Sequence, residues 1–175
     1  MKTKDMTLIA VMAALICIAG PLSIAVGPVP LSLASFAVYM AGAVLGAKRG
    51  TIAVCLYLII GLCGVPVFSG FSGGFPKLIG VTGGYLLGYI PCAFLTGLGA
   101  DGTRIIRDNR VSLPVAMLMG TFVLYLIGTV WFMALTGSSL GSALSICVVP
   151  FLPGDGIKIL AVSLLALPVR KAVYR

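Results

Sequence analysis

Long apolar runs separated by short polar or glycine–proline segments dominate this sequence and restrict what it can fold into. A helix needs about 20 mostly apolar residues to cross the roughly 30 Å hydrocarbon core of a bilayer. Hydrophobic residues make up 60% of the 175 residues and charged residues only 9%, which is not typical of a soluble domain. We therefore predict an all-α integral membrane protein, with residues 1–175 forming a single bundle of six transmembrane helices. The predicted spans are about 7–26, 31–47, 51–64, 81–100, 111–136 and 153–168.

The segments between the spans have distinct compositions. The first span is expected to bend at Gly20-Pro21, and a proline turn is expected at 26–30. Residues 65–80 are rich in glycine, proline and phenylalanine, and loops of this length and mobility are often lids. Residues 137–149 are polar and then mildly apolar, which favours a short helix that lies at the surface or dips into the membrane.

The basic residues are distributed asymmetrically among these segments. Six spans place both termini on one side, and by the positive-inside rule the side that carries most Lys and Arg is cytoplasmic. Because these residues punctuate the gaps between apolar runs, the net charge of +8 does not indicate nucleic-acid binding. Only Lys77 and Lys158 fall elsewhere among the twelve. The ten on the predicted cytoplasmic side are Lys2, Lys4, Lys48, Arg49, Arg104, Arg107, Arg110, Arg170, Lys171 and Arg175.

One acid and one base stand together at the start of the last span. Asp155 is the only acid among the last 67 residues, and Lys158 follows it by three positions, which places both on one face of a helix. A charge at a bilayer centre costs about 2.5–3.5 kcal/mol on insertion scales, so an intramembrane pair is expected to be used. Two interpretations remain: a structural ion pair that closes the outer mouth of the bundle, or a polar anchor for a small ligand in an apolar pocket.

Patterns typical of enzymes and nucleotide-binding proteins are missing. Gly97–Gly102 matches G-x-G-x-x-G, but it follows a predicted membrane helix instead of a strand. The chain has no histidine or glutamate, its other three acids lie at the cytoplasmic end, and no residue cluster suits a metal. We predict no enzymatic activity, no metal and no bound cofactor.

Several motifs follow one another in order along nearly the whole chain. They are Val29–Leu33 with Phe36, Ala41–Gly46, Leu62–Phe68 with the glycine loop after it, Thr82–Gly88, and Pro150–Asp155 with Lys158. Together they resemble BioY, the biotin-specific substrate-binding (S) subunits of energy-coupling factor transporters. One departure is Ala34-Ser35, where the family motif often has glutamine and threonine.

The resemblance implies capture of biotin from outside a bacterial cell membrane. It also implies partners, namely a transmembrane coupling subunit and two ATPase subunits. In such a complex the ATPase subunits use ATP, and this chain does not. Ala10 and Ala14 place small residues at i and i+4 of the first span, a spacing that serves either internal packing or docking. They match the docking motif of the family.

We predict how each candidate residue contributes to a biotin site. Asp155 accepts from the ureido N–H groups, and Lys158 is its polar partner or the counter-charge of the ligand. Alternatives are another vitamin such as thiamine or riboflavin, a purely structural membrane subunit, or, less well supported without histidine, an intramembrane hydrolase. The other predicted contacts are Thr82, Gly83 and Tyr85 in the wall, Phe68, Gly73 and Gly74 in the lid, and Ser32 and Ser35 from the second span.

Overall fold

Helices form most of the structure, a computed structural model that describes residues 3–24, 29–102 and 109–174. The elements in chain order are α1 (Thr3–Ala19), β1 (Ser23–Ile24), β2 (Leu31–Ser32), α2 (Ala34–Leu45), α3 (Ala47–Leu62), α4 (Phe75–Ile79), α5 (Gly83–Asp101), α6 (Asn109–Thr136), α7 (Leu140–Cys147) and α8 (Leu152–Val173). The described residues do not include positions 26–28 of the predicted turn, nor the basic residues Lys2, Arg104, Arg107 and Arg175.

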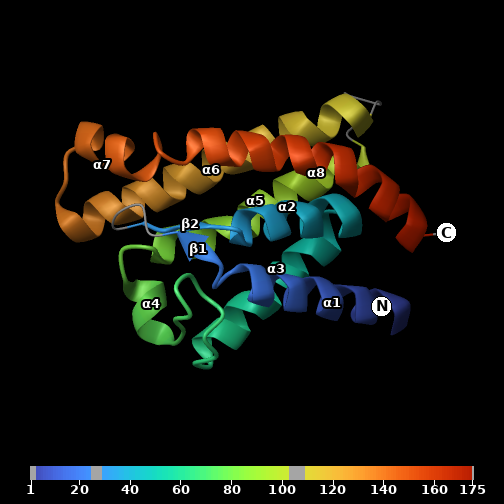
Figure 1. The fold of residues 1–175 in the computed structure, drawn as a ribbon, viewed down its shortest axis with the longest axis horizontal. Coiled ribbons are helices and arrows are strands. Elements are labelled where there is room, and N and C mark those ends of the chain that lie inside the picture. The colour runs from blue at the N-terminus through green and yellow to red at the C-terminus, as the bar shows by residue number, and fades with distance from the viewer. Residues whose placement is uncertain (1–2, 25–28, 103–108, 175) are drawn as a thin grey trace.

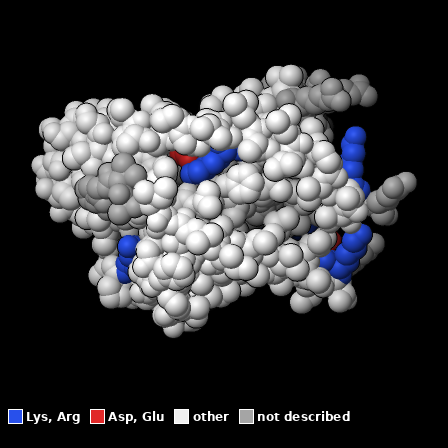
Figure 2. All heavy atoms as spheres, in the orientation of Figure 1, with Lys and Arg blue, Asp and Glu red and all other residues white. Residues whose placement is uncertain are grey.

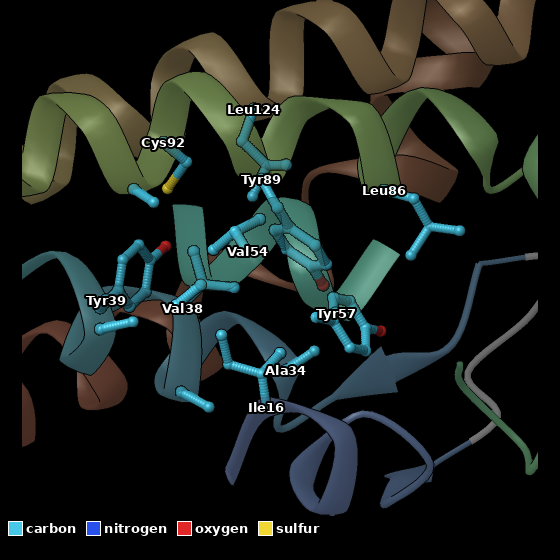
Figure 3. Close-up of a cluster of buried hydrophobic side chains, with 14 of the residues drawn as sticks. Ile16, Ala34, Val38, Tyr39, Val54, Tyr57, Leu86, Tyr89, Cys92 and Leu124 are labelled. Carbon is cyan, nitrogen blue, oxygen red and sulfur yellow. The ribbon is translucent and has the colours of Figure 1, made fainter. Parts of the chain in front are cut away.

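Helix α5 lies at the centre of the bundle. It packs against α6 on one side and against α2 and α3 on the other, while α1 covers α2 and α3, and α8 covers α2 and α6 (Figure 1). The core between α2, α3 and α5 holds three buried tyrosines, Tyr39, Tyr57 and Tyr89, among aliphatic side chains (Figure 3). The start of α1 and the end of α8 lie at the same end of the bundle (Figure 1).

Close approach between α2, α3 and α5 depends on small residues. Gly46 joins α2 to α3 with a φ of +81°, a left-handed value that favours glycine. A Cβ atom on Gly97 would collide with the backbone of Ala47, so α5 can cross this junction only without a side chain there. Small residues at helix crossings are typical of membrane bundles.

Three helices of the described chain are long and apolar enough to cross a membrane by length and composition: Gly83–Asp101, Val111–Thr136 and Leu152–Val173. Their outward faces carry large apolar side chains; Phe122 is 64% exposed and Leu164 is 76% exposed. Apolar surface of this extent is typical of a face that meets lipid or another protein.

The first and second predicted spans begin or end differently in the structure. Helix α1 stops at Ala19 instead of bending and continuing to Val26, because proline at 21 lacks an N–H and disfavours helix before it. The chain then forms β1, which pairs antiparallel with β2 through Ser23 opposite Ser32 and Ile24 opposite Leu31. Helix α2 consequently begins at Ala34, three residues later than predicted.

Two further segments correct the predicted boundaries. Helix α8 continues past Pro168 to Val173, so the proline lies inside the helix and does not end it. Residues 65–80 are not entirely loop, because they contain the short helix α4 and a bridge between Phe68 and Ser72. The short helix predicted within 137–149 is confirmed as α7, whose Ser139 accepts from the Ser142 backbone N–H.

Candidate ligand-binding site

Helix α8 places Asp155 and Lys158 inside the bundle, at the end opposite the described termini. Pro153 occupies the first turn of α8, where proline fits because no intrahelical partner is lost. Asp155 lies in the same turn, where a negative side chain complements the exposed N–H groups of the helix start. Both side chains are buried, with Asp155 5% exposed and Lys158 9% exposed.

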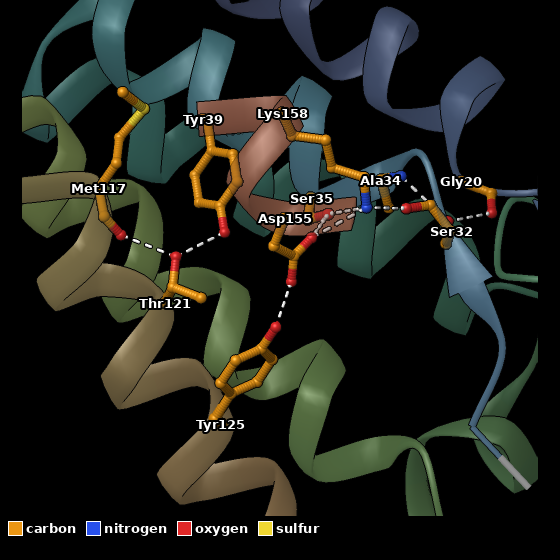
Figure 4. Close-up of polar contacts among 10 residues, drawn as sticks. All are labelled: Gly20, Ser32, Ala34, Ser35, Tyr39, Met117, Thr121, Tyr125, Asp155 and Lys158. Carbon is orange, nitrogen blue, oxygen red and sulfur yellow. Dashed lines mark hydrogen bonds and ion pairs between the residues drawn. The ribbon is translucent and has the colours of Figure 1, made fainter. Parts of the chain in front are cut away.

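All three N–H donors of the Lys158 ammonium group are used within the protein (Figure 4). Lys158 Nζ donates to Asp155 Oδ1 at 3.0 Å, to Ser35 Oγ at 2.8 Å and to the Ser32 carbonyl oxygen at 2.8 Å. The lysine therefore connects α8 to β2 and to the first turn of α2. A buried charge is tolerated when it is paired and hydrogen-bonded in this way.

The Asp155 carboxylate keeps acceptor capacity after its contacts are counted. Oδ1 accepts from Lys158 and from the Ser35 hydroxyl at 3.2 Å. Oδ2 accepts from the Tyr125 hydroxyl at 2.6 Å and from no other group of the described residues. Because a carboxylate oxygen has two acceptor positions, one position on Oδ2 is open to an N–H donor of a ligand.

The β2–α2 connection fixes the two serines of this network. Ser32 Oγ donates to the Gly20 carbonyl oxygen at 2.9 Å and accepts from the Ala34 backbone N–H at 3.0 Å. This contact satisfies one of the free N–H groups at the start of α2. The Ser32 carbonyl oxygen is thereby held toward Lys158, and Ser35 follows one turn later (Figure 4).

A cavity of about 60 Å³ adjoins the network and is mostly apolar and aromatic. Four tyrosines line it, Tyr57, Tyr85, Tyr89 and Tyr125, and their rings offer flat surfaces together with polar ends. One charged pair within an otherwise apolar, aromatic wall is the usual composition of a small-molecule site. The remaining lining residues are Val29, Pro30, Ser32, Ala34, Ser35, Ser69, Thr82, Leu86, Leu124, Cys147, Phe151, Asp155 and Lys158.

The structure brings six of the ten predicted contact residues to this cavity. Gly83 is not among them, because it packs against the Leu78 carbonyl oxygen near α4. The six are Asp155, Lys158, Thr82, Tyr85, Ser32 and Ser35.

The predicted lid residues Phe68, Gly73 and Gly74 are not among the residues that line the cavity. Phe68 is fully buried, with its ring edge-on to Tyr57 at 5.5 Å between centroids. Gly73 packs on the Val65 carbonyl oxygen, and Gly74 donates its N–H to the Gly61 carbonyl oxygen at 2.7 Å. From this loop, Ser69 reaches the cavity. The assignment of 65–80 as a lid stays a prediction.

Ala10 and Ala14 are both exposed on the outward face of α1, beside Val11 and Leu15. Internal packing, one of the two interpretations of their spacing, therefore does not account for this face within the described chain. A role in docking stays a prediction.

Tyr125 is the main site residue that sequence reasoning missed. It is the only tyrosine of α6, and a tyrosine within so apolar a helix needs a partner for its hydroxyl group. That signal could have identified Tyr125 as a candidate functional residue, but it could not have predicted the contact with Asp155.

Among the described residues, no group of three or more Cys, Asp, Glu or His side chains could hold a metal.

Comparison with known proteins places this geometry in context. The model of the BioY family matches residues 1–175. The chain belongs to the BioY family. A probable biotin transporter BioY of Pyrococcus horikoshii is 39% identical over 158 residues, covering 90% of this chain and 91% of the relative. A biotin transporter BioY of Thermotoga maritima is 37% identical over 161 residues, covering 92% of each chain.

A solved structure resembles the entire chain. The S-component for biotin from an ECF-type ABC transporter matches with a TM-score of 0.85 and 32% sequence identity, covering 100% of this chain and 95% of that protein. The predicted resemblance to BioY is thus confirmed by family, relatives and fold. The matched relatives are named as transporters and not as enzymes, in agreement with the prediction of no enzymatic activity.

Proposed function

We propose that this chain is the biotin-binding subunit of an energy-coupling factor transporter. The observation that carries the proposal is the buried Asp155–Lys158 pair beside an aromatic cavity, in a chain of the BioY family. Relatives named biotin transporters and a similar S-component for biotin support this ligand.

The contacts of the anchor favour different roles for its two charges. Biotin has a ureido ring with two N–H donors and a carbonyl, an apolar body and a carboxylate. Asp155 has an open acceptor position on Oδ2 and accepts a ureido N–H. Lys158 has no N–H donor left for a ligand. It therefore holds the Asp155 carboxylate in place and does not pair with the carboxylate of biotin. The tyrosines enclose the apolar body of the ligand.

We propose six membrane spans, formed by α1, α2, α3, α5, α6 and α8, in the bacterial cell membrane. Both described ends lie at one end of the bundle (Figure 1). Lys48, Arg49, Arg170 and Lys171 line one hollow there together with Asp5 and Tyr174, and Lys4 lies over the Tyr174 ring. By the positive-inside rule that end is cytoplasmic, which places the cavity toward the outside. Residues 65–80 then cover the cavity from outside, and Ser69 is their contact with it.

Energy for uptake comes from partners in this proposal. The exposed Ala10–Ala14 face of α1 is the docking surface for a transmembrane coupling subunit that carries two ATPase subunits. The chain itself binds no nucleotide and requires no cofactor.

Binding of radiolabelled biotin to the detergent-purified chain tests the proposal. We expect saturable binding that excess unlabelled biotin abolishes and that thiamine and riboflavin leave unchanged. Asp155→Asn removes the charge that accepts the ureido N–H, and hydrogen bonds to charged groups contribute about 1.5–3 kcal/mol, so binding weakens by about 10- to 100-fold. No saturable biotin binding, or displacement by thiamine or riboflavin, would overturn the proposed ligand.

Asp101→Asn is the matched control. Asp101 is also ion-paired, to Arg170 at 2.6 Å, but it lies at the other end of the bundle. The control therefore loses an equivalent charge and is expected to bind biotin like the parent. Equal weakening by both substitutions would instead indicate a general loss of structure.

A further inference from the structure

A second hollow lies at the end of the bundle that holds the described termini. It has a volume of about 1390 Å³ and is formed where the ends of α1, α5 and α8 meet the α2–α3 junction. Figure 2 shows that basic side chains gather at this end of the molecule. The candidate ligand-binding cavity shares no lining residue with this hollow, so the two are separate features.

Basic side chains outnumber acidic ones in the lining of this hollow. Four basic side chains line it, Lys48, Arg49, Arg170 and Lys171, against two acids, Asp5 and Asp101. Each acid already has an arginine partner: Arg49 lies 3.0 Å from Asp5, and Arg170 lies 2.6 Å from Asp101. Asp101 also accepts the Ala47 backbone N–H at 3.0 Å. Each carboxylate is therefore already paired with one arginine, and the lining holds no third acid for the other two cations.

Lys48 and Lys171 are the two remaining charges. Both are exposed, and neither has an ion-pair or hydrogen-bond partner among the described residues. They come from the start of α3 and the last turn of α8, two elements on either side of the same hollow. Two free ammonium groups facing one space attract an anion with several oxygen atoms, such as a phosphate group.

The rest of the lining is apolar and continues into the outer surface of α8. Leu45, Ile52 and Leu167 contribute to the hollow. Leu164, which is 76% exposed, precedes Lys171 by seven residues, or roughly 10 Å along a helix. A hollow lined by basic side chains and next to such an apolar face suits a molecule that combines a phosphate group with hydrocarbon chains, as a lipid does.

We infer that this hollow binds the phosphate headgroup of an anionic membrane lipid, with Lys48 and Lys171 as its contacts. Tyr174 extends the site, since its hydroxyl accepts from Arg49 at 2.9 Å and its ring lies under Lys4 at 6.0 Å. Aromatic and basic side chains together are typical of the level at which lipid headgroups lie. The lipid would join α3 to α8 from outside the bundle.

Native mass spectrometry of the delipidated chain tests this inference. The protein in neutral detergent is titrated with phosphatidylglycerol or phosphatidylcholine of identical acyl chains. We expect preferential retention of phosphatidylglycerol. Each near-surface lysine contributes about fivefold to binding of anionic lipid, so Lys48→Gln or Lys171→Gln lowers retention about fivefold, and both together about 25-fold. Lys77→Gln, on α4 at the other end, removes the same charge and leaves retention unchanged.

Three results would overturn the inference: equal retention of the two lipids, unchanged retention in the double variant, or an equal loss in Lys77→Gln. Glycerol 3-phosphate at millimolar concentration provides a further arm. If it displaces the lipid as effectively as added phosphatidylglycerol does, the site recognises a free phosphate ester instead of a lipid. The measurement involves no biotin, so its outcome is independent of the proposed ligand.

Discussion

The hydrogen bond that the Tyr125 hydroxyl donates to Asp155 Oδ2 is the shortest polar contact of the candidate site, at 2.6 Å. Tyr125→Phe removes this hydrogen bond and keeps the ring. This hydrogen bond holds the Asp155 carboxylate in the orientation that presents its open acceptor position to the ureido N–H. Because hydrogen bonds to charged groups contribute about 1.5–3 kcal/mol, loss of this orientation is expected to lower biotin affinity by about tenfold or more in isothermal titration calorimetry. Tyr85→Phe is the control, since Tyr85 donates to the neutral Cys147 carbonyl oxygen at 3.3 Å. A loss in Tyr85→Phe as large as in Tyr125→Phe would contradict a special role for Tyr125.

Lys158 is expected to contribute to stability more than to ligand contact. Lys158→Met leaves the Asp155 carboxylate buried without its cation, which costs about 3–5 kcal/mol in comparable pairs. The free energy of unfolding in detergent should fall by that order. Adding Asp155→Asn should restore part of it, because no uncompensated charge then remains. Independent, additive losses from the two substitutions would contradict a coupled pair.

Residue identity alone predicted part of this network. Asp155 and Lys158 stand out in the sequence because they are charges in an apolar segment, and their spacing predicts a shared helix face. Ser32 and Ser35 were predicted to reach the same site from the second span. Tyr125 could not be paired with Asp155, because that contact depends on how α6 packs beside α8. Such packing is set by the shapes of many side chains and not by a local pattern.

At the scale of elements, the crossing of α5 over the α2–α3 junction is a close backbone approach that no sequence pattern predicts. A Cβ atom on Gly97 would overlap the backbone of Ala47, whereas one on Gly141 of α7 would meet no atom within 4 Å. We expect Gly97→Ala to lower the unfolding free energy by about 1–3 kcal/mol through overpacking. Gly141→Ala is expected to be neutral or slightly stabilising, because alanine favours helix. Thermal unfolding of both variants checks the contrast, and equal melting temperatures would contradict it.

Element positions were predictable where one run of apolar residues forms one helix. The centres of α2, α3, α5, α6 and α8 fall within the predicted spans, because helix length follows from the length of the apolar run. The β1–β2 pair was not predictable, since two-residue strands leave no periodic pattern. Pro168 was misinterpreted as a helix end. In membrane bundles neighbouring groups compensate for a proline, so the helix continues past it.

For the whole molecule, the reactivity of Cys63 toward a membrane-impermeant reagent tests which end of the bundle faces outward. Helix α3 begins at the end of the bundle where Lys48 and Arg49 lie and runs toward the cavity. Cys63 directly follows the last residue of this helix. Cys63 is exposed, whereas Cys17 and Cys55 are half-buried, and Cys92 and Cys147 are buried. If the cavity faces outward, a membrane-impermeant maleimide labels intact cells that produce this chain, and Cys63→Ser abolishes the label. Lys171→Cys in the Cys63→Ser background places a thiol at the opposite end, so it should react only after the cells are permeabilised. The reverse pattern would place the basic end outside, and biotin would then have to reach the cavity from the cytoplasm.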